Sequence, residues 1–220
     1  MEAQTNAKEV DMKITVVGTG NMGSAFAKQL SGAGHVVRIT GRDIQKAEAL
    51  AARFEQVTAF TADQALGDSD VVVLATAYAD AVAALQSLGD LTGKVIIDIT
   101  NPLSADYMSL TIGHVTSASE EISKAVPQAQ VVKAFNTLFA QVLGDGPTFA
   151  DEQRGSVFVA SDSERAKQTA TALARSLGWN TVDTGGLINA RYLEPLAGLN
   201  IYLGYGAGLG TSIAPVWLNK

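Results

Sequence analysis

The chain has 220 residues, 47% of them hydrophobic, and its 22 acidic and 16 basic residues give a net charge of −6. Nucleic-acid binding requires a basic surface, so this acidic balance argues against a nucleic-acid partner. The chain has no cysteine, which excludes disulfides, thiolate nucleophiles and cysteine-held metal centres. We therefore expect redox chemistry only through a bound organic cofactor, and no metal site.

The first twelve residues, MEAQTNAKEVDM, are polar and lack the apolar core of a secretory signal. We predict a flexible leader over 1–12 and a cytoplasmic protein. At the other end, no charge lies between Glu194 and Lys220, a length compatible with a membrane span. Alternating glycines at 204–210 and Pro215 disfavour a continuous helix there. We expect this segment to be buried or covered by another subunit, with no membrane partner.

Short β-rich runs alternate with Ala-rich segments at helical spacing, the pattern of a parallel sheet with crossover helices. Six runs are predicted strands: KITVVG from Lys13, VVRIT from Val36, VTAF from Val57, VVVLAT from Val71, KVIIDIT from Lys94 and QVVKAF from Gln130. Two more, SVFVAS from Ser156 and NTVDTG from Asn180, are expected to extend the same sheet. The predicted fold class is α/β, with a doubly wound parallel sheet.

Two pairs of residues fit a capping box, in which side chains satisfy the first free backbone donors of a helix. Ser117 with Glu120 and Ser161 with Glu164 predict two helix starts. Residues 103–116 and 137–155 show neither the strand nor the helix period. Because loops of that length in a compact chain are usually functional or mobile, we expect the same of these two.

Gly18, Gly20 and Gly23 form G-x-G-x-x-G directly after the first predicted strand. In such a motif the first glycine permits a tight turn, the second lets the backbone approach a pyrophosphate, and the third lets helix and strand pack closely. The helix N-terminus then offers free N–H groups and a positive dipole end to phosphates. An ordinary glycine-rich turn is the alternative, but the position inside a βαβ unit favours a dinucleotide site.

The end of the second strand indicates which dinucleotide binds. An NAD site places an acidic residue there, whereas this chain has Thr40 and Gly41, followed by Arg42. With no carboxylate to repel a 2′-phosphate, the Arg42 guanidinium can pair with it through two hydrogen bonds, and Lys46 is a possible second cation. We predict NADP. The alternative is that Arg42 is a surface residue and Asp43 only caps the next helix.

Small or amide-bearing residues follow the other strands, where a ligand of a doubly wound sheet lies. They are Ala75, Thr76, Ala77, Thr100, Asn101, Pro102, Phe135, Asn136 and Thr137. They leave room for a nicotinamide and a second flat ring, and Asn101 or Asn136 could orient polar groups. Turn formation is the alternative role for both asparagines.

His114 is the one obvious proton donor, and an exposed loop histidine is its alternative interpretation. His35 is predicted to be structural. We therefore leave His114 and Asn136 as the catalytic candidates. Because no strong acid or base follows the strands, hydride transfer between two flat cofactors, which needs mainly proximity and stacking, is favoured over alcohol dehydrogenase chemistry.

Five segments together resemble the NADPH-dependent reductases of the deazaflavin coenzyme F-420 and the related cytosolic reductase domain of six-transmembrane metalloreductases. They are ITVVGTGNMGSAFAKQL, TGRDIQKAEALA, IIDITNPL, VVKAFNTLFA and VDTGGLINARYLEPLAGLNI. The resemblance implies an NADP-binding Rossmann domain over 13–186. It also implies a short helical, glycine-rich extension over 187–220 that completes a second-ring pocket or a homodimer interface.

The same resemblance assigns roles to individual residues. Thr19, Asn21 and Met22 would line the pyrophosphate loop, Arg42 would bind the 2′-phosphate, and 75–77 with Asn101 would lie on the nicotinamide side. Asn136 and 199–210 would face a second ligand, which is F-420, FMN or FAD. Gly41 departs from the family, where a serine often assists the arginine.

Two alternatives remain beside an NADP-dependent oxidoreductase with a small-molecule acceptor. Pyrroline-carboxylate reductases share the GxGNMG motif, but they append a large helical substrate domain, for which too few residues follow VDTGG. A non-catalytic NADP-binding sensor or partner domain would show the same fold and the same glycine loop.

Overall fold

The computed structural model describes residues 11–218, so the first ten residues of the predicted leader lie outside it. Six parallel strands form the main sheet in the order β3-β2-β1-β4-β5-β6. They are β1 (Lys13–Val17), β2 (Val36–Thr40), β3 (Val57–Ala59), β4 (Val71–Leu74), β5 (Val95–Asp98) and β6 (Gln130–Lys133). This is the strand order of a doubly wound nucleotide-binding fold, and it confirms the predicted α/β class.

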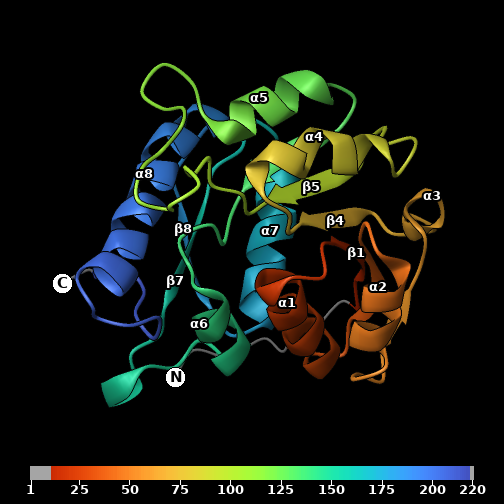
Figure 1. The fold of residues 1–220 in the computed structure, drawn as a ribbon, viewed down its shortest axis with the longest axis horizontal. Helices are drawn as coiled ribbons and strands as arrows, with labels where there is room; N and C mark the ends of the chain where they lie inside the picture. Colours follow the sequence, from red (N-terminus) through yellow and green to blue (C-terminus); the bar gives the residue numbers. More distant parts are fainter. Residues whose placement is uncertain (1–10, 219–220) are drawn as a thin grey trace, which may run out of the picture.

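Helices cover both faces of the main sheet (Figure 1). On one face lie α1 (Asn21–Gly32), α2 (Ile44–Ala51) and α7 (Glu164–Ser176). On the other lie α3 (Ala62–Ala65), α4 (Tyr78–Gln86) and α5 (Ala118–Ala125). Because both faces are covered, the central strands β4 and β5 are buried along their whole length, and all their residues except Asp98 are apolar.

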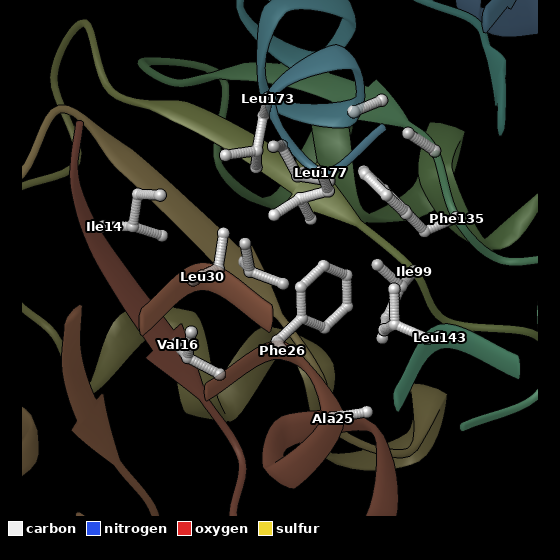
Figure 2. Close-up of a cluster of buried hydrophobic side chains, with 14 of the residues drawn as sticks. Ile14, Val16, Ala25, Phe26, Leu30, Ile99, Phe135, Leu143, Leu173 and Leu177 are labelled. Atoms are coloured by element: carbon white, nitrogen blue, oxygen red, sulfur yellow. The ribbon is translucent and has the colours of Figure 1, made fainter. Parts of the chain in front are cut away.

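The larger core lies between the sheet and the α1–α7 face (Figure 2). Phe26 of α1 packs edge-on against Phe135 after β6, with ring centroids 5.2 Å apart. Leu30 and Leu173 are fully buried beside them. Packing of this kind fixes α1, and with it the glycine loop, against the carboxyl ends of the strands.

The two strands expected to extend the main sheet do not join it. β7 (Ser156–Val159) and β8 (Asn180–Asp183) pair with each other in a separate parallel sheet. One antiparallel bridge, between Lys133 and Ala160, connects them to β6. Because this part of the chain meets β6 in the antiparallel sense, it does not continue the parallel ladder, and the prediction was wrong.

One predicted helix start is confirmed and the other shifts by two residues. Ser117 caps α5 by accepting a hydrogen bond from the Glu120 N–H at 3.2 Å. At α7 the cap is Ser163, which accepts from the Ala166 N–H, and Ser161 is not a cap. The Ser161 hydroxyl instead donates to the Val131 carbonyl of β6 at 2.7 Å, so it is used in joining the two sheets.

The segment 137–155 is more ordered than its lack of periodicity predicts. It contains α6 (Ala140–Asp145), which packs against α1, and a 3-10 turn (Ala150–Glu152). Six helical residues are too few to show a period in the sequence. Segment 103–116 has no helix, and its hydrogen bonds include one from the Ser104 hydroxyl to Asp106 at 2.6 Å.

The C-terminal segment consists of a 3-10 turn (Leu187–Asn189), α8 (Ala190–Ile201) and one π-helical turn (Tyr202–Gly206). Figure 1 shows α8 at the side of the molecule opposite α2 and α3. Among residues 11–218, none of the helices combines the length and the hydrophobicity needed to cross a lipid bilayer. In the uncharged segment Ala197 and Gly204 are buried while Tyr205 and Leu209 are exposed, so it is only partly buried within the chain, and covering by another subunit stays a prediction.

Candidate functional site

The glycine loop joins the ends of β1, β2 and β4. Gly18 has φ +130°, and its N–H donates to the Thr40 carbonyl at 2.8 Å. A Cβ on Gly18 would lie 2.2 Å from the Ala75 carbonyl oxygen, and one on Gly23 would lie 1.9 Å from that of Gly18. Only glycine fits at these two positions, because a side chain at either would collide with backbone.

Gly20 differs from its two neighbours because a Cβ there would meet no described atom within 4 Å. It is the N-cap of α1, and within residues 11–218 no side chain caps this helix. Asn21 and Met22 follow in the first turn, where backbone N–H groups have no intrahelical acceptor. The loop is thus an open, positively polarised surface of the kind that accepts a phosphate.

The end of β2 presents its two cations to solvent. The Arg42 side chain is 88% exposed, and its guanidinium lies 3.6 Å from the Asp80 carboxylate of α4. Lys46 is also exposed, on the first turn of α2. Asp43 caps α2 by accepting from the Gln45 N–H at 3.0 Å, as the sequence suggested. An ion pair this exposed contributes little stability, so Arg42 is free to exchange Asp80 for an anion.

Gly41 lies directly beside the pyrophosphate loop. A Cβ at Gly41 would come within 3.1 Å of the Thr19 methyl carbon. A serine at position 41 would therefore crowd Thr19.

Asn101 and Asn136 lie side by side at the ends of β5 and β6. The Asn101 amide donates to the Asn136 carbonyl at 2.8 Å, and the Asn136 amide donates to Asn101 Oδ1 at 2.9 Å and to the Leu193 carbonyl at 3.0 Å. Both amide hydrogens of Asn136 are therefore engaged. Its side chain links β5, β6 and α8, a geometry more suited to positioning Asn101 than to proton transfer.

Five of the six buried side-chain oxygens without a hydrogen-bond partner among the described residues lie at this edge of the sheet, and the sixth, Ser69 Oγ, lies before β4. The five are Oγ1 of Thr40, Thr76, Thr100 and Thr137, and Oδ1 of Asn136. Buried polar atoms are normally paired, because each unpaired one costs about 1–3 kcal/mol. A ligand rich in polar groups at the carboxyl ends of β2, β4, β5 and β6 would fit these residues.

Sequence reasoning missed a buried charge cluster formed by Asp98, Lys133 and Glu194. Asp98 and Lys133 are register partners on β5 and β6, and the Lys133 ammonium lies 2.8 Å from Asp98 and 3.0 Å from Glu194 of α8. It also donates to the Thr100 carbonyl at 2.6 Å. All three side chains are at most 1% exposed. The sequence did contain an indication of this cluster, namely one charged residue in each of two otherwise apolar predicted strands. A charge buried in a sheet needs a partner of opposite charge nearby.

Glu194 also fixes α8 to α5. Its carboxylate accepts hydrogen bonds from the N–H groups of Ala118 at 2.9 Å and Ser119 at 3.2 Å. Burial raises the pKa of Glu194, and the charge of Lys133 and the Ala118 N–H oppose this shift. Nearby, Arg191 of α8 binds Glu120 of α5 through two bonds of 2.9 and 2.7 Å, which lowers the pKa of Glu120.

The two histidines occupy different environments. His114 is exposed in the loop before α5, with a left-handed φ of 60°, and the structure neither supports nor excludes its candidate role. His35 is buried, as expected of a structural residue. Its Nδ1 accepts from the Met12 N–H at 3.2 Å, and its Nε2 lies 2.8 Å from the Ser176 hydroxyl.

The glycine-rich segment lies beside α1 and α6. A Cβ on Gly204 would come within 2.6 Å of Phe139, whose ring packs edge-on against Tyr205 at 5.6 Å. A groove of about 410 Å³ runs from Asn21 along α1 to Tyr205 and Thr211. The second-ring segment predicted at 199–210 therefore borders a groove that begins at the pyrophosphate loop.

Comparison with known proteins places these features in a family. The family model described as "NADP oxidoreductase coenzyme F420-dependent" matches residues 13–102. Rat metalloreductase STEAP3 is 30% identical over 185 residues, which cover 84% of this chain and 36% of the relative. The chain thus spans about a third of the length of the curated metalloreductases that it matches.

Two solved structures show the same architecture. An Arthrobacter sp. FB24 protein described as a candidate F-420-dependent NADP reductase is 31% identical, with a TM-score of 0.82 over 91% of this chain and 96% of that one. An imine reductase from Pseudomonas sp. shares the fold at 22% identity, with a TM-score of 0.64 over 90% of this chain and 64% of that one. The sheet order, the glycine loop and these matches show that the chain belongs to the family of F-420-dependent NADP oxidoreductases.

Proposed function

We propose that the protein binds NADP(H) along the carboxyl edge of the main sheet and transfers a hydride between it and a flat redox acceptor. The observation that carries this proposal is the open backbone surface over Gly20, framed by Gly18 and Gly23, where side chains would collide with backbone. The unpaired oxygens of Thr76, Thr100 and their neighbours support it, because the polar groups of a dinucleotide could pair with them.

The residues of the chain would bind and orient, whereas the nicotinamide would supply the hydride chemistry. The first turn of α1 would bind the pyrophosphate, and Arg42 would exchange Asp80 for the 2′-phosphate, with Lys46 beside it. Residues 75–77, Asn101 and Pro102 would position the nicotinamide ring. Proximity and orientation of two rings can supply much of the rate of such a transfer.

The second ligand in this proposal is F-420, FMN or FAD, and it would face the segment 199–210, which borders the groove between α1, α6 and Tyr205. The proposal includes a homodimer that covers the exposed apolar side chains of α8 and the π-helical turn. Those include Tyr192, Leu199 and Tyr202, each more than half exposed. Large exposed apolar patches on a folded chain mark interaction sites.

Anaerobic NADPH oxidation by the purified protein tests the proposal, with oxidised F-420, FMN, FAD and riboflavin offered in parallel and NADH as the control donor. Fast turnover with one acceptor supports the oxidoreductase and identifies the second ligand. Binding of NADPH without turnover on any acceptor would favour the sensor alternative. Absence of NADPH binding would refute the proposal.

A pair of matched variants tests the second-ring site. Gly208 has φ +75° and Gly89 has φ +92°, and a Cβ on either would meet no described atom within 4 Å. Both Gly208→Val and Gly89→Val therefore place a side chain at a left-handed φ, with open space at the Cβ position in each case. We expect only Gly208→Val to abolish turnover, with the Kd for NADPH unchanged. Equal activity of the two variants would contradict the placement of the second ligand.

A further inference from the structure

The hydrogen bonds around the buried charge cluster are those of two carboxylates and one ammonium. The Glu194 carboxylate accepts hydrogen bonds from the Ala118 N–H, the Ser119 N–H and the Lys133 ammonium. The Asp98 carboxylate accepts hydrogen bonds from the Thr100 N–H, the Ser119 hydroxyl and the Lys133 ammonium. A proton on Glu194 would face only N–H donors, and on Asp98 its one acceptor would be the Ser119 hydroxyl, which donates in this arrangement. Two carboxylates and one ammonium leave a formal charge of −1, which the N-terminus of α5 offsets by about half.

This charge lies at the carboxyl edge of the sheet, beside the proposed nicotinamide site. The Lys133 ammonium donates a hydrogen bond to the carbonyl of Thr100, the residue before Asn101 in the chain. Across the edge, Tyr78 directly follows the nicotinamide-side residues 75–77, and its pKa is raised, first by burial and then by the charges of Glu121, Glu194 and Asp98.

Other charges nearby are largely compensated by partners. Glu120 is paired with Arg191 and Glu121 with Lys124, while Asp80, which Arg42 would leave in the proposed NADP complex, is 45% exposed. Those pairs are at least partly exposed, so solvent screens them. The cluster is the uncompensated and buried charge at this edge among the described residues, and burial weakens its screening.

We infer that Asp98, Lys133 and Glu194 act as a positioning charge that favours the oxidised nicotinamide over the reduced one; this inference rests on the proposed function. Loss of a hydride, two electrons and one proton, converts the neutral dihydronicotinamide ring into a pyridinium with one positive charge. The flavin or deazaflavin acceptor gains that hydride. A net negative charge beside the ring stabilises the pyridinium, so bound NADPH becomes a stronger hydride donor than free NADPH.

The ratio of the Kd for NADP⁺ to the Kd for NADPH measures this effect without turnover. We expect wild-type protein to bind NADP⁺ at least as tightly as NADPH. A unit charge acting over about 10 Å at an effective dielectric constant of about 40 changes such a ratio about fourfold. Glu194→Gln and, independently, Asp98→Asn are therefore expected to raise the ratio by about that factor.

Asp68→Asn is the matched control. It removes one negative charge from an exposed carboxylate that pairs with Lys13 at the start of β1, the opposite edge of the sheet. We expect its ratio to equal that of wild type. Thermal unfolding with and without nucleotide shows whether each variant folds, and one folded variant of Glu194 or Asp98 suffices for the comparison.

The outcomes separate the inference from the proposed function. Parallel weakening of both nucleotides, with an unchanged ratio, would mean that the cluster is only structural and would overturn the inference, while leaving NADP binding intact. A wild-type protein that binds NADPH much more tightly than NADP⁺ would overturn it without any variant. If wild-type protein bound neither nucleotide, the proposed function would fail and the inference with it.

Discussion

The substitution Gly20→Ala should separate nucleotide binding from folding. A methyl group at position 20 meets no described atom within 4 Å, and the backbone φ of −78° is accessible to alanine. Alanine is a poorer N-cap than glycine, so the expected loss of folding free energy is at most about 1 kcal/mol. The methyl group would nevertheless occupy the open surface over which we place the pyrophosphate.

The other two glycines of the loop give the contrast. Gly18→Ala combines a φ of +130° with a Cβ 2.2 Å from a backbone oxygen, and Gly23→Ala places its Cβ 1.9 Å from another. Neither collision is relieved by rotating a side chain, because both partners are backbone. The left-handed φ adds about 1–3 kcal/mol at Gly18, and the backbone collision acts at both positions, so we expect both variants to lose several kcal/mol of stability or fail to fold.

Urea unfolding and titration of NADPH fluorescence measure the two properties on the same samples. We expect Gly20→Ala to unfold near the wild-type midpoint and to bind NADPH at least about tenfold more weakly, which corresponds to about 1.4 kcal/mol. Wild-type affinity in a folded Gly20→Ala protein would refute the reasoning, because the pyrophosphate would then not approach the backbone at this glycine.

Three further predictions follow from charged residues. Arg42→Ala should weaken NADPH binding by roughly 1.5 to 3 kcal/mol and NADH binding hardly at all. Asp80→Asn should strengthen NADPH binding, because it frees Arg42 from its ion pair. Calorimetric titration of both nucleotides measures these changes, and equal losses for NADPH and NADH would contradict the phosphate role of Arg42. Lys133→Met should cost about 3–5 kcal/mol in urea unfolding, because two buried carboxylates lose their partner, and a neutral effect would show that they had taken up a proton. The hydrogen bond from Arg191 lowers the pKa of Glu120 in the folded protein below its unfolded-state value near 4.5. The ion pair therefore stabilises the fold fully above that pH, and this stabilisation is lost as the pH falls through the pKa of Glu120 in the folded protein. The stability difference between wild type and Glu120→Gln should therefore shrink between pH 7 and pH 3, and a constant difference would contradict the role of this ion pair.

Local patterns in the sequence were enough to predict the main sheet and the glycine loop. The six strands appear as apolar runs because a parallel sheet covered on both faces needs apolar side chains in both directions. Gly18 and Gly23 are demanded by backbone contacts within one βαβ unit and with the adjacent strand β4, and the chemistry at Thr40, Gly41 and Arg42 follows from a single strand end. Such features depend on residues close in the chain or in a known register.

Other features depend on contacts between distant segments, and only the tertiary structure decided them. The antiparallel approach at Lys133 and Ala160 separates β7 and β8 from the main sheet, and the bond from Ser161 to Val131 takes away its capping role. The buried charge cluster brings together β5, β6 and α8, whose residues Asp98 and Glu194 are far apart in the sequence. A sequence read locally shows that a buried charge needs a partner, but the partner's identity is set by packing.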